Sequence, residues 1–122
     1  MEEIQNSKHY DLEDRTLEFS KRIIKLCKLL GSDVVNRNLA NQLIRSGTSM
    51  GANYREANET ETKKDFQFRI RICRKEGKET VYWIKLVMEA NPEIAERLED
   101  LLGETSELVK IFAAILEKTK VV

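Results

Sequence analysis

The sequence predicts an all-α protein, an antiparallel up-down four-helix bundle formed by a single domain over residues 1–122. Apolar residues recur every three or four positions through four long stretches, which is the spacing of one helix face. The chain has one proline and five glycines, so helix breakers are few. Because short connections place successive helices side by side, the four stretches favour a bundle.

The first predicted helix runs from about Leu12 to Leu30. Asp11 can cap its start, and Gly31 follows its end in the C′ position that glycine favours. Gly31-Ser32-Asp33 is predicted to form a turn. The core positions of this helix are Leu12, Thr16, Phe19, Ile23, Leu26 and Leu30.

The second predicted helix, from about Val34 to Ala57, has two apolar seams. Each glycine inside a helix costs roughly 1 kcal/mol relative to alanine. Gly47 and Gly51 therefore predict close approach to another backbone, although local rules also allow a loop over residues 46–52. The seams are Leu39, Leu43, Ser46, Met50, Asn53 and Ala57, and Ala40, Ile44, Gly47, Gly51 and Tyr54.

The third helix is predicted to follow a polar turn at residues 58–61 and to end near Ala90. Thr62 and Asp65 resemble a capping box at its start. Residues 66–72 alternate in the manner of a strand, but three-to-four spacing continues for several more turns, so a helix is predicted. The core seam is Phe66, Ile70, Cys73, Gly77, Thr80, Ile84 and Val87.

The fourth helix is predicted to start at Asn91-Pro92 and to run to about Lys118. Asparagine suits the N-cap position and proline the first helical position. The apolar positions repeat four-three without a break, which makes this the clearest period in the chain. They are Ile94, Leu98, Leu101, Thr105, Leu108, Phe112 and Ile115.

Composition excludes several classes of protein. Residues 1–10 contain no apolar leader segment and are predicted to be flexible, and the longest apolar run, Ile111–Leu116, is too short to cross a bilayer. A cytoplasmic protein without a membrane partner is therefore predicted. Cys27 and Cys73 fit no metal or redox spacing and are predicted to be small buried hydrophobes.

Charge is unevenly distributed although the net charge is zero. Residues 21–86 hold fifteen basic and seven acidic side chains, whereas residues 87–122 hold four and eight. The basic middle can pair with the acidic ends within the bundle or between subunits, or it can form a functional basic surface.

The third helix carries more apolar surface than one stripe. Phe68, Ile72, Trp83 and Leu86 lie at about 200° to 260° from Phe66 on a helical wheel, roughly opposite the core seam. Exposed aromatic residues on a second face predict a homo-oligomer interface. The alternative is that the seam is misplaced and the helix is simply central in the bundle.

Beside that second face, cations alternate with aromatic residues at helical spacing. Such a run can follow a nucleic-acid backbone and stack bases on Phe68 or Tyr82. The alternative is a solvated face with extended lysines. The candidate nucleic-acid-binding residues are Lys64, Arg71, Lys75, Lys78 and Lys85.

Two motifs point to a known family. Residues 42–53, which read QLIRSGTSMGAN and continue to Glu56-Ala57, form one; the other comprises Asp65-Phe66, Lys75-Glu76, Glu79-Thr80 and Tyr82-Trp83-Ile84. From about Asp11 to Leu116 the chain resembles the 23S rRNA-intervening-sequence proteins. The resemblance implies antiparallel four-helix bundles that assemble into rings, typically pentamers, and an association with RNA. This chain is neutral, whereas the related accessory variability proteins of retroelements are strongly basic.

Five polar residues of these motifs are predicted to form a network between the second and third helices. Arginine–glutamate pairs suit buried interhelical contacts, so a role in fixing the bundle register is predicted, with a functional groove as the alternative. The residues are Arg45, Asn53, Glu56, Glu76 and Glu79.

The sequence does not contain the usual catalytic arrangements. His9 is the only histidine, Glu76-x-x-Glu79 has no histidine partner for a di-iron site, and no phosphate-binding glycine loop is present. We therefore expect no catalytic residues, metal, cofactor or small-molecule substrate. The leading hypothesis is an oligomeric adaptor, associated with RNA or a ribonucleoprotein, in which repeated weak surfaces act by avidity. The rival is a protein-binding scaffold without a nucleic-acid role.

Overall fold

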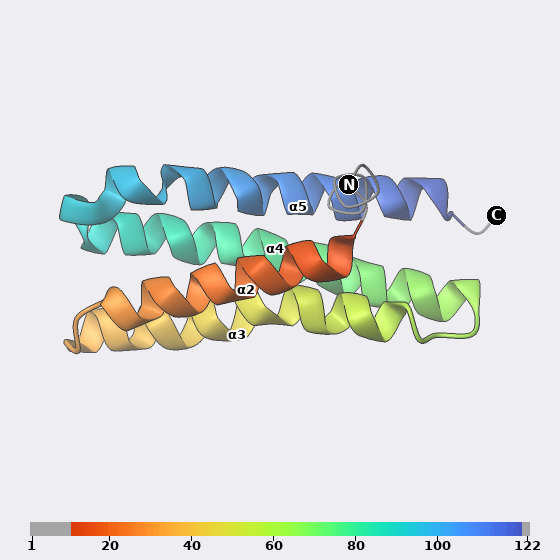
Figure 1. Ribbon diagram of the computed structural model, residues 1–122, viewed down its shortest axis with the longest axis horizontal. Coiled ribbons are helices and arrows are strands. Elements are labelled where there is room, and N and C mark those ends of the chain that lie inside the picture. The colour runs from red at the N-terminus through yellow and green to blue at the C-terminus, as the bar shows by residue number, and fades with distance from the viewer. Residues whose placement is uncertain (1–10, 121–122) are drawn as a thin grey trace, which may run out of the picture.

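The structure, a computed structural model, describes residues 11–120 and is helical throughout that range apart from short connections (Figure 1). The all-α prediction is confirmed for these residues, whereas the predicted flexible segment 1–10 lies outside them. One 3₁₀-helix, η1, joins the last two α-helices. The elements are α2 (Leu12–Leu29), α3 (Val34–Ala57), α4 (Lys63–Ala90), η1 (Pro92–Leu98) and α5 (Glu99–Lys118).

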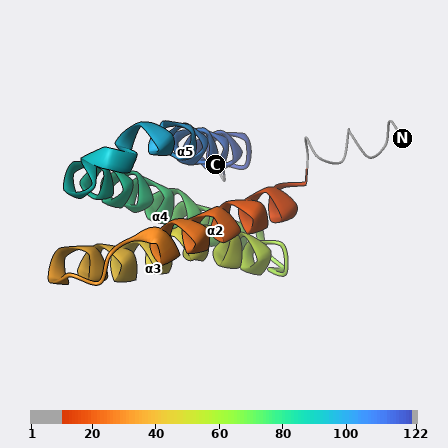
Figure 2. The same ribbon diagram turned by 60° about the vertical axis from the view of Figure 1, so that its left-hand side comes forward.

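Helix α4 lies between α5 and the pair formed by α2 and α3, as both views show (Figures 1 and 2). The ribbon doubles back at each connection, so helices that are consecutive in the chain pack side by side. With 28 residues, α4 is the longest helix and spans roughly 42 Å. Its central place gives it a packed side against α3 and α5 and an outer side.

Three helix starts are capped by side chains. Asp11 Oδ1 accepts from the backbone N–H of Asp14 (3.1 Å), and Thr62 Oγ1 accepts from that of Asp65 (3.0 Å), as predicted. Asp33, which was assigned only to a turn, caps α3 in the same way. Each cap satisfies a backbone donor that the first helical turn leaves unpaired.

The ends of α2 and α4 differ from the prediction. Gly31 follows α2 without the left-handed conformation of a C′ glycine; the chain leaves the helix through Leu30, which is extended (φ −73°, ψ 150°). Asn91 does not cap the next helix with its side chain, and residues 92–98 form a 3₁₀-helix in place of the predicted first turns of an α-helix. The hydrogen bonds of the Asn91 side chain explain why it does not cap the next helix.

The Asn91 side chain joins α4 to the start of α3. Its Nδ2 donates to Asn36 Oδ1 (2.8 Å) and to the Val87 carbonyl (2.9 Å), while Asn36 Nδ2 donates back to Asn91 Oδ1 (3.2 Å). Both asparagines are buried. Because its amide is committed to these partners, Asn91 has no side-chain oxygen free to cap Pro92–Leu98.

The predicted core seams of the first, third and fourth helices are confirmed, because every seam position is buried or packs partly buried against the core. The two glycines of α3 allow close packing against α2, mainly against side chains and not against the backbone as predicted. A Cβ atom on Gly47 would lie 2.9 Å from Ile23 Cγ1, and one on Gly51 would lie 3.0 Å from Thr16 Oγ1. The loop alternative for residues 46–52 is excluded, since α3 is continuous there. Ile44 departs from the second seam and is exposed.

Candidate functional site

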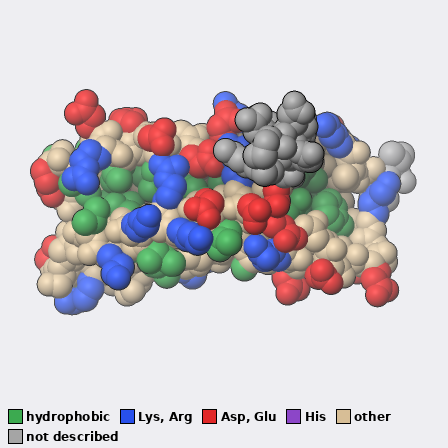
Figure 3. Space-filling model, in the orientation of Figure 1, with side chains coloured by type: hydrophobic (Ala, Val, Ile, Leu, Met, Phe, Trp, Pro, Cys, Tyr) green, Lys and Arg blue, Asp and Glu red, His purple; other side chains and the backbone are tan. Residues whose placement is uncertain are grey.

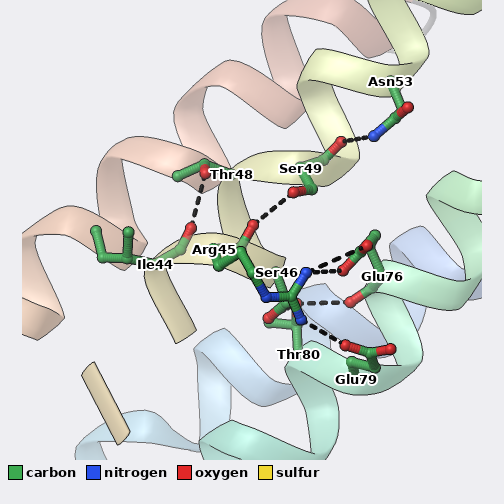
Figure 4. A network of polar contacts seen from close by, with 9 residues as sticks. All are labelled: Ile44, Arg45, Ser46, Thr48, Ser49, Asn53, Glu76, Glu79 and Thr80. Atoms are coloured by element: carbon green, nitrogen blue, oxygen red, sulfur yellow. Dashed lines mark hydrogen bonds and ion pairs between the residues drawn. The ribbon is translucent and has the colours of Figure 1, made fainter. Parts of the chain in front are cut away.

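The packed side of α4 holds an arginine between two glutamates (Figure 4). Arg45 Nη1 of α3 donates to both carboxylate oxygens of Glu76 (3.2 and 3.4 Å), and Nη2 donates to Glu79 Oε1 (2.7 Å). The hydrogen bond to Glu79, followed by the charge of Glu76, raises the pKa of Arg45. Glu76 is buried, so this pairing satisfies a carboxylate that would otherwise be desolvated without a partner.

Hydroxyl groups continue the polar contact between the same two helices. Thr80 Oγ1 lies 2.9 Å from Ser46 Oγ, and both side chains are fully buried. On the same helix, Thr48 Oγ1 donates to the Ile44 carbonyl and Ser49 Oγ to the Arg45 carbonyl (Figure 4). Bonds of this kind satisfy small polar side chains within the helix itself.

The predicted five-residue network divides into two clusters. Arg45, Glu76 and Glu79 form one, whereas Asn53 and Glu56 meet Arg69, which was not among the predicted residues. Arg69 Nη1 donates to Asn53 Oδ1 (3.0 Å), and its Nη2 lies 4.0 Å from Glu56 Oε1. In each cluster the guanidinium bridges α3 and α4, which is the arrangement expected of a register-fixing contact.

The outer face of α4, predicted as Phe68, Ile72, Trp83 and Leu86, is divided into two patches. Phe68 is 58% exposed, whereas the other three are half-buried and Trp83 packs against the edge of the core. Fifteen residues separate Phe68 from Trp83, which corresponds to roughly 22 Å along a helix. The face therefore presents an exposed phenylalanine near its N-terminal end and a partly covered tryptophan near its C-terminal end.

The tryptophan patch contains an unsatisfied donor. Trp83 Nε1 is buried and has no hydrogen-bond partner among residues 11–120. Tyr82 beside it is 58% exposed and meets the Trp83 ring edge-on, with centroids 5.0 Å apart. A buried indole N–H usually has a partner, and residues 11–120 of one copy supply none to this patch.

The phenylalanine patch forms a shallow hollow of about 430 Å³, here called the cationic hollow, with an apolar floor and a basic rim. No acidic side chain of residues 11–120 lies within ion-pair distance of its four cations. Three of those cations were predicted to bind nucleic acid, and Arg74 was not among them. The lining residues are Phe68, Arg71, Ile72, Arg74, Lys75 and Lys78.

The two remaining predicted cations do not reach this hollow. Lys64 and Lys85 are exposed on the same helix, towards either end of it, and line no part of the hollow. Together with Arg71, Lys75 and Lys78 they leave a basic line along α4.

A second hollow of about 360 Å³, here called the acidic hollow, adjoins the first at the turn between α3 and α4. Phe68 lines both hollows, so its ring lies on a boundary between opposite charges. Sequence periodicity gave no sign of this boundary, because Glu56 and Glu59 precede the turn and Phe68 follows it. The lining residues are Glu56, Glu59, Thr60, Asp65, Phe68 and Arg69.

A third hollow, of about 210 Å³, lies between α2 and the η1–α5 junction. In Figure 3, basic and hydrophobic side chains stand next to one another over this region. Leu26, Leu98 and Leu101 belong to its apolar lining, and Arg22, Lys25 and Arg97 supply charge. Arg22 already pairs with Asp100 (2.8 Å).

Elsewhere the basic and acidic segments pair, as one of the two charge interpretations expected. Arg22 meets Asp100, and Arg55 lies 3.5 Å from Glu13. Outside the basic segment, Arg15 of α2 forms two bonds with Glu104 of α5 (2.8 and 2.9 Å). The cations of the cationic hollow differ from these, because they have no such partners within residues 11–120.

Two other kinds of feature are absent from residues 11–120. No helix there is both long and apolar enough to cross a membrane. No group of three or more histidine, cysteine, aspartate or glutamate side chains in that range could hold a metal ion.

Comparison with known proteins decides the family. A family model described as 23S rRNA-intervening sequence protein matches residues 8–114. The chain belongs to this family. The match spans both motifs, at residues 42–57 and 65–84, so the resemblance read from the sequence is confirmed.

A solved structure supports the same assignment. A protein of unknown function from the S23 ribosomal protein family of Bacteroides thetaiotaomicron is 34% identical to this family member. The match covers 85% of this chain and 96% of that one, with a TM-score of 0.74. No curated protein matches the sequence.

Proposed function

We propose that this chain is a non-enzymatic, cytoplasmic adaptor that binds RNA or a ribonucleoprotein through the cationic hollow of α4. Its single domain is an antiparallel up-down bundle, and copies assemble into a homo-oligomeric ring of five, in line with what the family resemblance implied. Each copy contributes one weak basic surface, and a ring repeats it, so that avidity replaces single-site affinity.

The observation that supports RNA binding most strongly is the set of cations without acidic partners on α4. Arg45 and Arg69, on the packed side of the same bundle, both meet carboxylates. The four cations of the cationic hollow have none within residues 11–120, and they line the same hollow as an exposed aromatic ring. Unpaired cations beside an aromatic ring are the combination that binds phosphates and bases.

Self-association is assigned to the C-terminal patch of the outer face. The buried Trp83 N–H has no acceptor within residues 11–120, and Tyr82 and Leu86, one residue before it and three after it, add apolar surface. A second copy can provide both the acceptor and the covering surface. This leaves Phe68, about 22 Å away, outside the contact.

The test is RNA binding by fluorescence anisotropy over a series of salt concentrations, using the full chain and a structured ribosomal RNA fragment. Each phosphate contact contributes a log–log slope of about 0.7 to 0.9, so several contacts give a steep dependence. The test variant is Arg71→Glu with Lys75→Glu. Its matched control is Lys110→Glu with Lys118→Glu, which makes the same charge change at exposed positions of α5.

We expect the α4 double variant to lose binding and slope while its oligomer mass stays unchanged, and the α5 control to retain both. Equal losses in the two variants would show only a general charge effect. No binding by the unaltered protein at low salt would remove the RNA hypothesis.

A protein-binding scaffold is the second candidate, and the ion pairs Arg22–Asp100 and Arg55–Glu13 favour it, since they show that basic and acidic segments of this chain attract each other. In a scaffold, the α4 cations would pair with acidic surfaces of neighbouring copies. The α4 double variant would then disturb the oligomer. Native mass spectrometry distinguishes the two, and Trp83→Ala, which removes the proposed contact, should shift the mass towards monomer.

A further inference from the structure

Phe68 occupies a boundary that no other described aromatic residue shares. Its ring is 58% exposed and lines both the cationic and the acidic hollow. Phosphates are attracted to the side that holds Arg71 and Lys75. They are repelled from the other side, where three carboxylates outnumber the single cation Arg69. A neutral, planar group is therefore the part of a nucleic acid that suits the ring itself.

We propose that Phe68 stacks an unpaired nucleobase, so that the cationic hollow binds single-stranded RNA in preference to duplex RNA. This inference rests on the proposed RNA binding and names the form of RNA that the same site takes. A base without sequence preference is sufficient, because every base has a face that can stack on an aromatic ring.

Duplex RNA does not offer this contact. Its bases are covered above and below by their neighbours, and recognition is left to backbone and shape. A phenylalanine that projects from the side of a helix reaches a base face only where the strand is unpaired and the base can turn outward. Duplex binding would use the cations alone and would leave Phe68 without a partner.

The acidic hollow favours one course for the bound strand. Arg71, Lys75 and Lys78 follow Phe68 at successive turns, with rises of about 4.5, 6 and 4.5 Å along the axis. Glu56, Glu59 and Asp65 lie on the other side of the ring. The strand therefore runs from Phe68 towards Lys78, with its phosphates on the cations and one base on the ring.

The experiment compares one unstructured RNA of about 12 nucleotides, within the site sizes of single-strand binders, with the same strand annealed to its complement. Both are titrated by fluorescence anisotropy against the full chain. Phe68→Leu keeps an apolar side chain of similar size but removes the aromatic face. Leu17→Ala, at an exposed position of α2, is the control. Native mass spectrometry accompanies each variant.

We expect the single strand to bind at least about tenfold more tightly than the duplex. Phe68→Leu should weaken single-strand binding about fivefold or more and leave duplex binding and oligomer mass unchanged. Equal binding of the two RNAs, unaffected by Phe68→Leu, would overturn this inference and leave the proposed function standing.

Two further outcomes can be told apart from equal binding of the two RNAs. If neither RNA binds at low salt, the proposed function fails, and this inference fails with it. If Phe68→Leu lowers the oligomer mass, Phe68 belongs to a contact between copies, and the stacking role is excluded while cation-mediated RNA binding is not.

Discussion

The packed and outer sides of α4 differ in whether charged side chains are paired and whether large apolar side chains are buried. On the packed side, Arg45 meets Glu76 and Glu79, Thr80 meets Ser46, and Ile70 is fully buried. On the outer side, Phe68 is mostly exposed and the neighbouring cations have no acidic partners within residues 11–120. One helix thus joins the bundle by one side and leaves the other for a ligand or another copy.

The largest expected effect separates two isoleucines that lie two positions apart on α4. Ile70→Ala should lower the free energy of unfolding by about 2 to 5 kcal/mol, because it opens a cavity in the core. Ile72→Ala, at a half-buried position of the outer side, should cost less than about 1 kcal/mol. Chemical denaturation at one fixed protein concentration measures both values.

Similar costs for the two substitutions would break the comparison. They would mean that another copy covers Ile72 in solution, and the cost of Ile72→Ala would then grow with protein concentration.

A smaller effect is expected from two glycines in helix interiors. A Cβ on Gly77 of α4 would lie 2.7 Å from Val109 Cγ2 and 3.1 Å from Met50 Sδ, whereas one on Gly103 of α5 would meet nothing within 4 Å. Gly77→Ala should destabilise the protein by about 1 to 2 kcal/mol, since overpacking exceeds the gain in helix propensity. Gly103→Ala should stabilise it by about 0.5 to 1 kcal/mol.

Thermal unfolding of the two alanine variants provides the measurement, and opposite shifts in Tm are expected. A stabilising Gly77→Ala would show that α5 can move away from α4, and that the packed side is less tightly constrained than its contacts imply.

Alanine substitution of one arginine on each side of α4 compares how much the two charges contribute to stability. Arg45→Ala leaves the buried Glu76 carboxylate unpaired and should cost about 1 kcal/mol, with allowance for the half-exposed guanidinium. Arg71→Ala should change stability by less than about 0.5 kcal/mol. Urea denaturation of both variants tests this. A matching loss at Arg71 would indicate an acidic partner on another copy and would favour the scaffold.

The smallest effect concerns the two cysteines. Burial raises the pKa of Cys27 to about 11 and that of Cys73 to about 12, so at pH 8 roughly one thiol in a thousand or fewer is ionised. Both should react slowly with a thiol reagent in the folded protein, Cys27 first because it is only partly buried, and rapidly in guanidinium. Fast labelling of Cys73 without denaturant would mean that the packed side of α4 opens readily.

Periodicity predicted nearly all of the helical fold. All the positions of the four-three repeat from Leu98 to Phe112 are buried, because a bundle helix must place one continuous stripe in the core. They are Leu98, Leu101, Thr105, Leu108 and Phe112. Local chemistry also sufficed for the caps at Asp11 and Thr62, whose partners are only three residues away.

Partners distant in the sequence could not be predicted in the same way. Arg69 and Asn53, or Asn36 and Asn91, meet only after α3 and α4 have been aligned, and no local rule fixes that alignment. The 3₁₀-helix at 92–98 depends on it as well, since Asn91 is held by Asn36 instead of capping the next turn.

The sequence by itself determined which faces are apolar, where helices start and which family the chain resembles, because these follow from spacing and short motifs along one chain. Only the tertiary structure decided which arginines near Phe68 are paired. Arg69 and Arg71 lie two positions apart in the sequence, yet the packing of α3 on α4 brings Asn53 and Glu56 to Arg69, while no carboxylate of residues 11–120 reaches Arg71. The position of Phe68 between two hollows of opposite charge has the same origin, since it requires the α3–α4 turn to bring Glu56 beside α4.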